Sequence, residues 1–193
     1  YEKEVGRLQV SVCRLQEPNP LSPAQEKAYG EIHETFKTKE VCLLHGVTSS
    51  GKTEIYVRLI HEVLRLGRQV LYMLPEIAIT TQITERLAKL FGDKLLVYHS
   101  KFSDNERVEV WNRLLHTGEP MLVLGVRSSL FLPFKDLGLI IIDEEHENTY
   151  KQQDPAPRYH ARNAALVLAG MHGAKTLLGS ATPSIDSYFI FHP

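Results

Sequence analysis

The sequence predicts an α/β protein built on an open, doubly wound, mainly parallel sheet with helices on both faces. Three observations support this prediction. Short apolar runs alternate with longer helical patterns along the 193 residues. Several of these runs are apolar at consecutive positions, as in a parallel sheet that is covered on both faces. The segments between the runs begin at capping residues and end at glycines, as expected for crossover helices.

The elements follow one another in a regular order. The predicted strands are 41–44, 70–74, 95–98, 121–124, 139–142 and 176–178. The first helix begins at Ser22, where Gln25 completes a capping box and Pro23 suits the first turn. The other predicted helices are 53–66, 80–91, 103 to near 118, 160–169 before Gly170, and 184–191. Residues 1–20 are expected to be the tail of a preceding domain and a linker, and residues 21–193 the domain itself.

The composition excludes several classes of protein. Hydrophobic residues make up 43% and charged residues 23% of the chain, as in globular proteins. The formal net charge is −1, so any nucleic-acid site must be a local groove. Cys13 and Cys42 form no C-x-x-C pair and indicate neither a zinc site nor a disulfide framework. No apolar run approaches the ~20 residues of a membrane span, and no signal peptide opens the chain, so we expect a cytoplasmic protein.

A phosphate-binding loop follows the first predicted strand. The segment Gly46-Val47-Thr48-Ser49-Ser50-Gly51-Lys52-Thr53 has the spacing G-x-x-x-x-G-K-T between a strand and a helix. The two glycines allow backbone N–H groups to surround a phosphate, and the helix N-terminus adds its positive dipole end. Lys52 reaches the outer phosphates, and the Thr53 hydroxyl is a ligand for Mg²⁺. We therefore predict that all of these residues bind a nucleotide.

A cluster of acids follows the fifth predicted strand. Asp143 ends this strand, at the edge where open α/β sheets bind ligands. Its carboxylate is expected to hold the Mg²⁺ that Thr53 also contacts, and Glu144 to activate the water that attacks the γ-phosphate. Consecutive acids are otherwise a solvated loop, but the phosphate loop on the same sheet favours catalysis by Lys52, Asp143 and Glu144. His146 is either a surface histidine or a link between this site and the next loop.

Together these motifs resemble the first RecA-like lobe of a superfamily-two helicase. The sequence DEEH at 143–146 and the segments 74–78 and 179–184 restrict the resemblance to a smaller group within this superfamily. The segments 124–134 and 150–153 narrow it again. Over about residues 20–193 the chain is similar to the bacterial primosomal helicases that restart stalled replication forks.

The resemblance implies ATP and Mg²⁺ as cofactors, with hydrolysis driving 3′-to-5′ movement on single-stranded DNA. It aligns Gln25 with the glutamine that recognises adenine, although Gln25 also belongs to a capping box. Ser180 and Thr182 resemble the motif that couples hydrolysis to strand movement, and His146 is expected to take part in this coupling. Small hydroxyl residues at a strand end also make ordinary turns.

By the same resemblance, two regions are expected to contact DNA. Thr80, Arg127 and Ser128 are candidates for DNA phosphates, with a helix cap as the alternative for Thr80 and a surface salt bridge for Arg127. The segment 148–160 resembles the family's aromatic-rich loop, which combines stacking faces with positive charge. Its candidates are Tyr150, Tyr159, Lys151, Arg158 and the nearby Arg162. The alternative is a proline-stiffened surface loop whose tyrosines pack on the domain.

The predicted function is that of the ATP-binding lobe of a replication-restart DNA helicase. The resemblance implies single-stranded and forked DNA, other primosome proteins and single-strand-binding proteins as partners, no membrane, and a nucleoid-associated location. The second helicase lobe and a zinc module are expected outside this chain, so we expect poor activity from the chain alone. The alternatives are a lobe of another superfamily-two DNA or RNA helicase or translocase, a small-molecule kinase, and a docking module with a vestigial nucleotide site.

Overall fold

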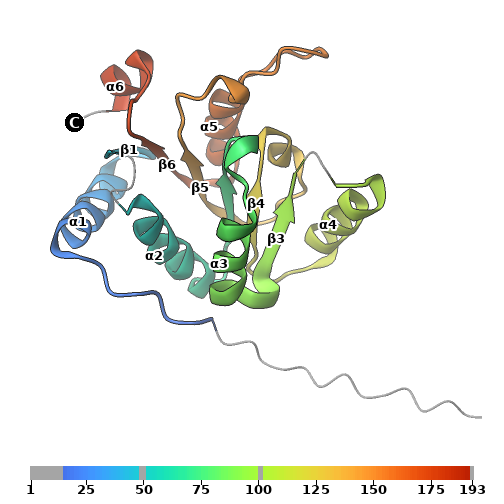
Figure 1. The fold of residues 1–193 in the computed structure, drawn as a ribbon, viewed down its shortest axis with the longest axis horizontal. Helices are drawn as coiled ribbons and strands as arrows, with labels where there is room; N and C mark the ends of the chain where they lie inside the picture. The colour runs from blue at the N-terminus through green and yellow to red at the C-terminus, as the bar shows by residue number, and fades with distance from the viewer. Residues whose placement is uncertain (1–14, 48–50, 100–101, 192–193) are drawn as a thin grey trace, which may run out of the picture.

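A single parallel sheet forms the centre of the molecule (Figure 1). The computed structural model describes residues 15–47, 51–99 and 102–191. All five pairings between neighbouring strands are parallel, in the order β1-β6-β5-β2-β4-β3. All six predicted strands are confirmed, as β1 (Val41–His45), β2 (Gln69–Met73), β3 (Leu95–Tyr98), β4 (Leu122–Gly125), β5 (Leu137–Asp143) and β6 (Lys175–Ser180).

Helices cover both faces of the sheet, as predicted. They are α1 (Pro23–Thr38), α2 (Lys52–Arg65), α3 (Thr81–Phe91), α4 (Asp104–His116), α5 (Ala161–His172) and α6 (Ile185–Phe191). One apolar core contains residues of α1, α2 and α3, and the other contains residues of α4 and α5. Short 3₁₀ turns complete the chain at η1 (Glu76–Ala78), η2 (Gly92–Lys94), η3 (Arg127–Phe131) and η4 (Asn148–Tyr150).

The consecutive apolar residues of β5 are explained by these two cores. Ile140 and Ile142 lie in the core under α4 and α5, and Ile141 lies in the core under α1 to α3. All three are fully buried. Burying one such side chain stabilises the fold by about 1.5–3 kcal/mol. Neither face of this strand therefore has a place for a polar residue until Asp143.

The helix ends follow local signals with one exception. The capping boxes at Ser22 and Ser103 are both present. The predicted stop at Gly170 is wrong, because α5 continues through this residue to His172. The chain leaves the helix at Gly173, whose φ of 58° is in the left-handed region that glycine adopts without strain. Gly170 and Gly173 lie within one helical turn, and either glycine could end the helix. Only the backbone conformation, with a positive φ at Gly173, shows which one does.

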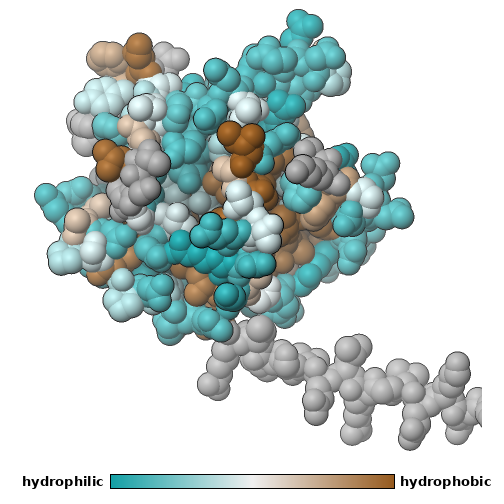
Figure 2. Space-filling model, in the orientation of Figure 1, coloured by the Kyte–Doolittle hydropathy of each residue, from teal (hydrophilic) through white to brown (hydrophobic). Residues whose placement is uncertain are grey.

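The last helix lies beyond the carboxyl end of the sheet (Figure 1) and belongs to neither core. Its residues Ile185 and Phe189 are 75% and 81% exposed, and strongly hydrophobic atoms gather over α6 in Figure 2. At the other end of the described chain, Gln16 donates its backbone N–H to the carbonyl of Leu90. Within the described residues, no helix combines the length and apolar character needed to cross a membrane.

The sheet register brings the sequence motifs together. His45 pairs with Ser180, and Asp143 pairs with Gly179. Because β1, β6 and β5 are adjacent and parallel, their carboxyl ends meet at one edge. The phosphate loop and the acidic cluster therefore each begin one strand spacing from the segment after β6, and two strand spacings from each other.

Candidate functional site

The phosphate loop spans the gap between β1 and α2. The Gly46 backbone N–H donates to the carbonyl of Ser180 at 3.1 Å, which ties the start of the loop to β6. Gly51 precedes α2 with a φ of 78°, a conformation that favours glycine. A Cβ atom there would lie 2.3 Å from Nε2 of Gln25, so glycine is required for space as well. Val47 is exposed, whereas Thr48, Ser49 and Ser50 lie outside the described residues.

Gln25 combines the two roles that the sequence left open. Its side-chain oxygen accepts the backbone N–H of Ser22 at 2.8 Å and closes the capping box. Its side-chain nitrogen donates to the carbonyl of Gly51 at 3.1 Å. The cap therefore holds this amide against the phosphate loop.

Asp143 is held at the end of β5 by buried donors. Its Oδ1 accepts from the hydroxyl of Tyr56 at 3.0 Å and from the backbone N–H of Glu144 at 3.1 Å. Burial raises the pKa of the Asp143 carboxyl, and the hydrogen bond from Tyr56 opposes this shift. A Cβ atom at Gly179 would lie 1.8 Å from the Tyr56 hydroxyl oxygen. Only glycine on the neighbouring strand leaves room for this donor.

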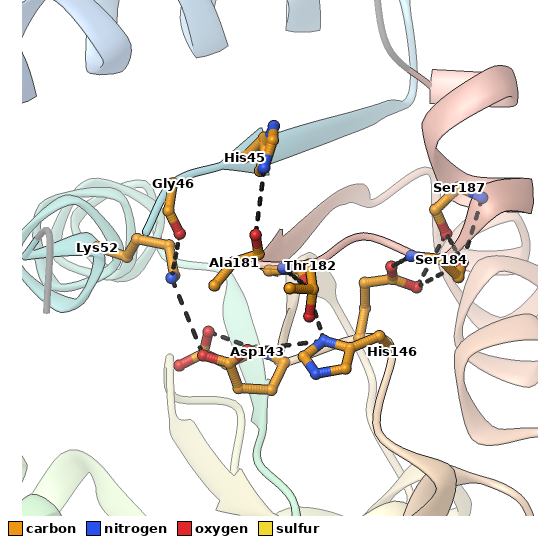
Figure 3. A network of polar contacts seen from close by, with 12 residues as sticks. His45, Gly46, Lys52, Asp143, His146, Ala181, Thr182, Ser184 and Ser187 are labelled. Carbon is orange, nitrogen blue, oxygen red and sulfur yellow. Dashed lines mark hydrogen bonds and ion pairs between the residues drawn. The ribbon is translucent and has the colours of Figure 1, made fainter. Parts of the chain in front are cut away.

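Glu144 lies between a lysine and a histidine. Its Oε1 is 3.9 Å from Nζ of Lys52, and its Oε2 is 3.7 Å from Nδ1 of His146. Lys52 is buried and donates to the carbonyl of Gly46 at 2.8 Å (Figure 3). The φ of Glu144 is 48°, an uncommon and strained value for a residue other than glycine. This backbone turn places the carboxylate beside the phosphate-loop lysine.

The three residues predicted to couple hydrolysis to movement are in contact. His146 Nδ1 is hydrogen-bonded to the Ser180 hydroxyl at 2.7 Å, and the Thr182 backbone N–H donates to the same hydroxyl at 3.1 Å (Figure 3). Ser180 is fully buried at the end of β6. A chain of contacts thus runs from Lys52 through Glu144 and His146 to the segment after β6.

The third acid of the cluster has a role that sequence reasoning missed. The Glu145 carboxylate is buried and accepts from Arg162 at 2.8 Å, from the backbone N–H of Ser184 at 2.8 Å and from the Ser187 hydroxyl at 2.9 Å. Burial acts to raise the pKa of Glu145, but the hydrogen bonds from Arg162, Ser184 and Ser187 outweigh it and lower the pKa. The expectation that Arg162 offers its charge to DNA is wrong, because this side chain is only 12% exposed and paired.

The segment after the acidic cluster forms a protruding hairpin (Figure 1). Lys151 and His160 form an antiparallel bridge, and the Gln152 N–H donates to the Tyr159 carbonyl at 3.0 Å. The Lys151 ammonium donates to the Arg158 carbonyl at 2.6 Å, so it links the two arms. Arg158 is exposed near the tip.

The two tyrosines of this segment differ in their surroundings. Tyr150 is 1% exposed, and its hydroxyl donates to the carbonyl of Asp143 at 2.7 Å and lies 3.2 Å from that of Met73. The prediction that it offers a stacking face is therefore wrong: the ring fills the core and the hydroxyl satisfies the strand end. Tyr159 is half-buried and meets the ring of Phe131 edge-on, with ring centres 5.1 Å apart.

The other predicted DNA contacts lie in η3 and at the start of α3. Arg127 donates to the carbonyls of Thr149 and Lys151, at 3.2 and 3.4 Å, rather than to a carboxylate as in the alternative of a surface salt bridge. Its contact with a DNA phosphate stays a prediction. Ser128 is half-buried. Thr80 caps α3 by accepting from the N–H of Ile83 at 3.4 Å. It also lines a cavity of about 500 Å³ together with residues of α3 and with His99, Phe102 and Val126.

A second cavity, of about 280 Å³, lies over the phosphate loop. Its lining comprises Gly51, Lys52, Thr53, Glu54, Arg86, Asp143 and Glu144. The Thr53 hydroxyl and the Asp143 carboxylate are the hard oxygen donors that suit Mg²⁺, which usually completes its shell with phosphate and water. Among the described residues no cluster of three or more metal-binding side chains occurs. Sequence reasoning missed Glu54 and Arg86.

Comparisons with known proteins agree with this geometry. Residues 22–188 match the family model described as DEAD/DEAH box helicase. The replication restart protein PriA of Bacillus subtilis (strain 168) is 47% identical over 174 residues, which are 89% of this chain and 21% of that protein. The PriA of Synechocystis sp. is 42% identical over 193 residues, 99% of this chain and 23% of that protein. The chain therefore spans less than a quarter of the length of these relatives.

Solved structures show the same fold. RecG bound to a three-way DNA junction aligns with a TM-score of 0.62 and 24% identity, covering 91% of this chain and 23% of that one. The Hef helicase domain of Pyrococcus furiosus aligns with a TM-score of 0.58 and 21% identity, covering 83% of this chain and 33% of that one. The predicted RecA-like fold and the resemblance to restart helicases are thus confirmed. With the family model matching residues 22–188, the chain belongs to the DEAD/DEAH box helicases.

Proposed function

We propose that this chain is the ATP-binding lobe of a DNA helicase that restarts replication at stalled forks. One observation supports it most: the contacts of Lys52, Glu144, His146 and Ser180 connect the nucleotide cavity to the segment after β6. The similarity to replication restart proteins of two organisms points to the same function.

In this proposal the phosphate loop and Lys52 bind the phosphates of ATP, and Gln25 recognises the adenine. Thr53 and Asp143 hold Mg²⁺, which neutralises charge on the phosphate oxygens when bound. The strained backbone at Glu144 directs its carboxylate into the cavity, where it orients the attacking water and accepts its proton. Lys52 and His146 lie on either side of this carboxylate and fix its position.

The same proposal assigns DNA contacts to the hairpin and its neighbours. Arg158 and Lys151 supply positive charge, Tyr159 supplies a partly exposed ring, and Ser128 and Thr80 supply hydroxyls. Arg127 acts here by holding the base of the hairpin through two backbone carbonyls. Because the hairpin begins directly after Tyr150, which donates to the Asp143 carbonyl, DNA bound there is linked to the metal-binding strand end.

The remaining properties are proposed from the similarity to replication restart proteins. They are 3′-to-5′ movement, forked DNA as the substrate, primosome and single-strand-binding proteins as partners, and action in the cytoplasm at the nucleoid. Zinc is proposed only for a part of the protein outside this chain. The chain alone is expected to hydrolyse ATP slowly, because a second lobe supplies an arginine to the transition state in such enzymes.

The test measures phosphate release from Mg-ATP by the full-length helicase, with and without single-stranded DNA, because the chain alone is expected to turn over slowly. Glu144→Gln should lower turnover by roughly 100-fold or more while nucleotide binding is retained. Glu147→Gln removes the same charge in the same segment, outside the cavity lining, and should leave turnover unchanged. Turnover that is indifferent to DNA would favour a small-molecule kinase, and stimulation by RNA alone would favour another superfamily-two branch. Equal turnover in the two variants would refute the assigned role of Glu144.

A further inference from the structure

Arg86 brings a second positive charge to the nucleotide cavity from a different helix. It lies on α3, whereas the phosphate loop and Lys52 belong to the start of α2. Its guanidinium lines the cavity and donates to the carboxylate of Glu54, the residue that follows Thr53. None of the sequence motifs includes either residue.

The formal charges of the cavity show why this arginine matters. The lining carries two cations, Lys52 and Arg86, against the three carboxylates of Glu54, Asp143 and Glu144. Lys52 already donates to a loop carbonyl and lies near Glu144. Without Arg86, one cation would face three carboxylates, an unfavourable setting for a triphosphate with several negative charges.

The Arg86–Glu54 pair is a weak structural contact. The two side chains are 39% and 26% exposed, and ion pairs in such settings contribute little to stability. The guanidinium carries five N–H donors in a planar fork, and the contact with Glu54 uses one nitrogen. The guanidinium shares the lining of the cavity with Asp143 and Glu144.

We propose that Arg86 is a phosphate-binding residue for a nucleoside triphosphate in this cavity. The planar fork matches phosphate oxygens, which arginine binds through two parallel N–H bonds. This inference rests on the proposed ATP site and adds a contact from α3 to it. The positive charge thus comes from within this lobe.

Equilibrium binding of a fluorescent ATP analogue with Mg²⁺ tests the proposal, with thermal unfolding as the check on folding. Arg86→Gln should weaken binding by about tenfold or more, as expected for the loss of a charge-assisted hydrogen bond. Lys89→Gln removes one exposed positive charge from the same helix and should bind like the wild type. Equal affinity of Arg86→Gln and wild type would overturn the proposal.

Glu54 variants distinguish phosphate binding from simple neutralisation. Glu54→Gln should bind as well as the wild type or better, because it removes a carboxylate and leaves Arg86 available. The double variant Glu54→Gln, Arg86→Gln should stay as weak as Arg86→Gln. Wild-type affinity in the double variant would mean that Arg86 only neutralises Glu54. A loss of affinity in Glu54→Gln as large as that in Arg86→Gln would mean that nucleotide binding depends on the Arg86–Glu54 ion pair and not on the guanidinium alone. Either result overturns the proposal.

Lys52→Ala, measured in parallel, separates this inference from the proposed function. If neither wild type nor Lys52→Ala binds nucleotide, the ATP site is wrong and the inference falls with it. If Lys52→Ala abolishes binding and Arg86→Gln leaves it unchanged, the ATP site stands and only the role of Arg86 is refuted.

Discussion

Replacing Glu145 by alanine should destabilise this protein far more than its position in an acidic cluster indicates. The carboxylate is fully buried and joins the end of β5 to α5 and to the start of α6. Removing it leaves the guanidinium of Arg162, only 12% exposed, without its counter-charge.

The size of the effect follows from these contacts. Breaking a buried ion pair from one side costs about 3–5 kcal/mol, because the remaining charge is left uncompensated. Arg162 keeps the hydroxyls of Ser184 and Ser187, at 2.6 and 2.9 Å, so we expect the lower end, about 3 kcal/mol. For a domain of this size that corresponds to a fall in Tm of roughly 6–12 °C.

Urea and thermal unfolding measure this difference directly. Glu31→Ala is the matched control, because its carboxylate pairs with Lys27 on an exposed face of α1, with side chains 68% and 79% exposed. It should change stability by less than about 1 kcal/mol. If Glu145→Ala lost no more stability than Glu31→Ala, the buried contacts of Glu145 would not be what holds β5, α5 and α6 together.

Three further predictions follow from single contacts. Folding lowers the pKa of Glu145, so its ionised carboxylate stabilises the fold above the unfolded pKa of about 4.3. This stabilisation is lost as the pH falls through the folded pKa. The unfolding free energies of wild type and Glu145→Gln should therefore differ near pH 7 and converge at acidic pH. Tyr150→Phe should cost about 1–2 kcal/mol of stability, by leaving the Asp143 carbonyl without its donor, and should not change affinity for single-stranded DNA measured by anisotropy. A large loss of DNA affinity at unchanged stability would show that this ring does contact DNA. Gly51→Ala and Gly67→Ala should each lower stability by about 1 kcal/mol, because both residues have positive φ. Only Gly51→Ala should also weaken nucleotide binding, because its Cβ atom would meet Gln25.

Features that depend on a few neighbouring residues were predictable. The capping boxes at Ser22 and Ser103, the loop glycines at 46 and 51, and the apolar run before Asp143 each encode their own conformation. The spacing of the phosphate loop and the position of Asp143 at a strand end were enough to predict a nucleotide site. Strand order was not predictable in the same way, because pairing partners are far apart in the chain.

The amino-acid sequence was enough to predict the six strands, the covering helices and the phosphate loop between β1 and α2. The directions in which side chains of the same type point became clear from the folded structure alone. Tyr150 and Tyr159 lie nine positions apart in one segment, yet one fills the core and the other remains partly exposed. Arg162 faces a buried carboxylate, and Arg86 reaches the nucleotide cavity from α3. Burial and ion pairing arise from contacts between distant segments, and a local pattern of residues does not record such contacts.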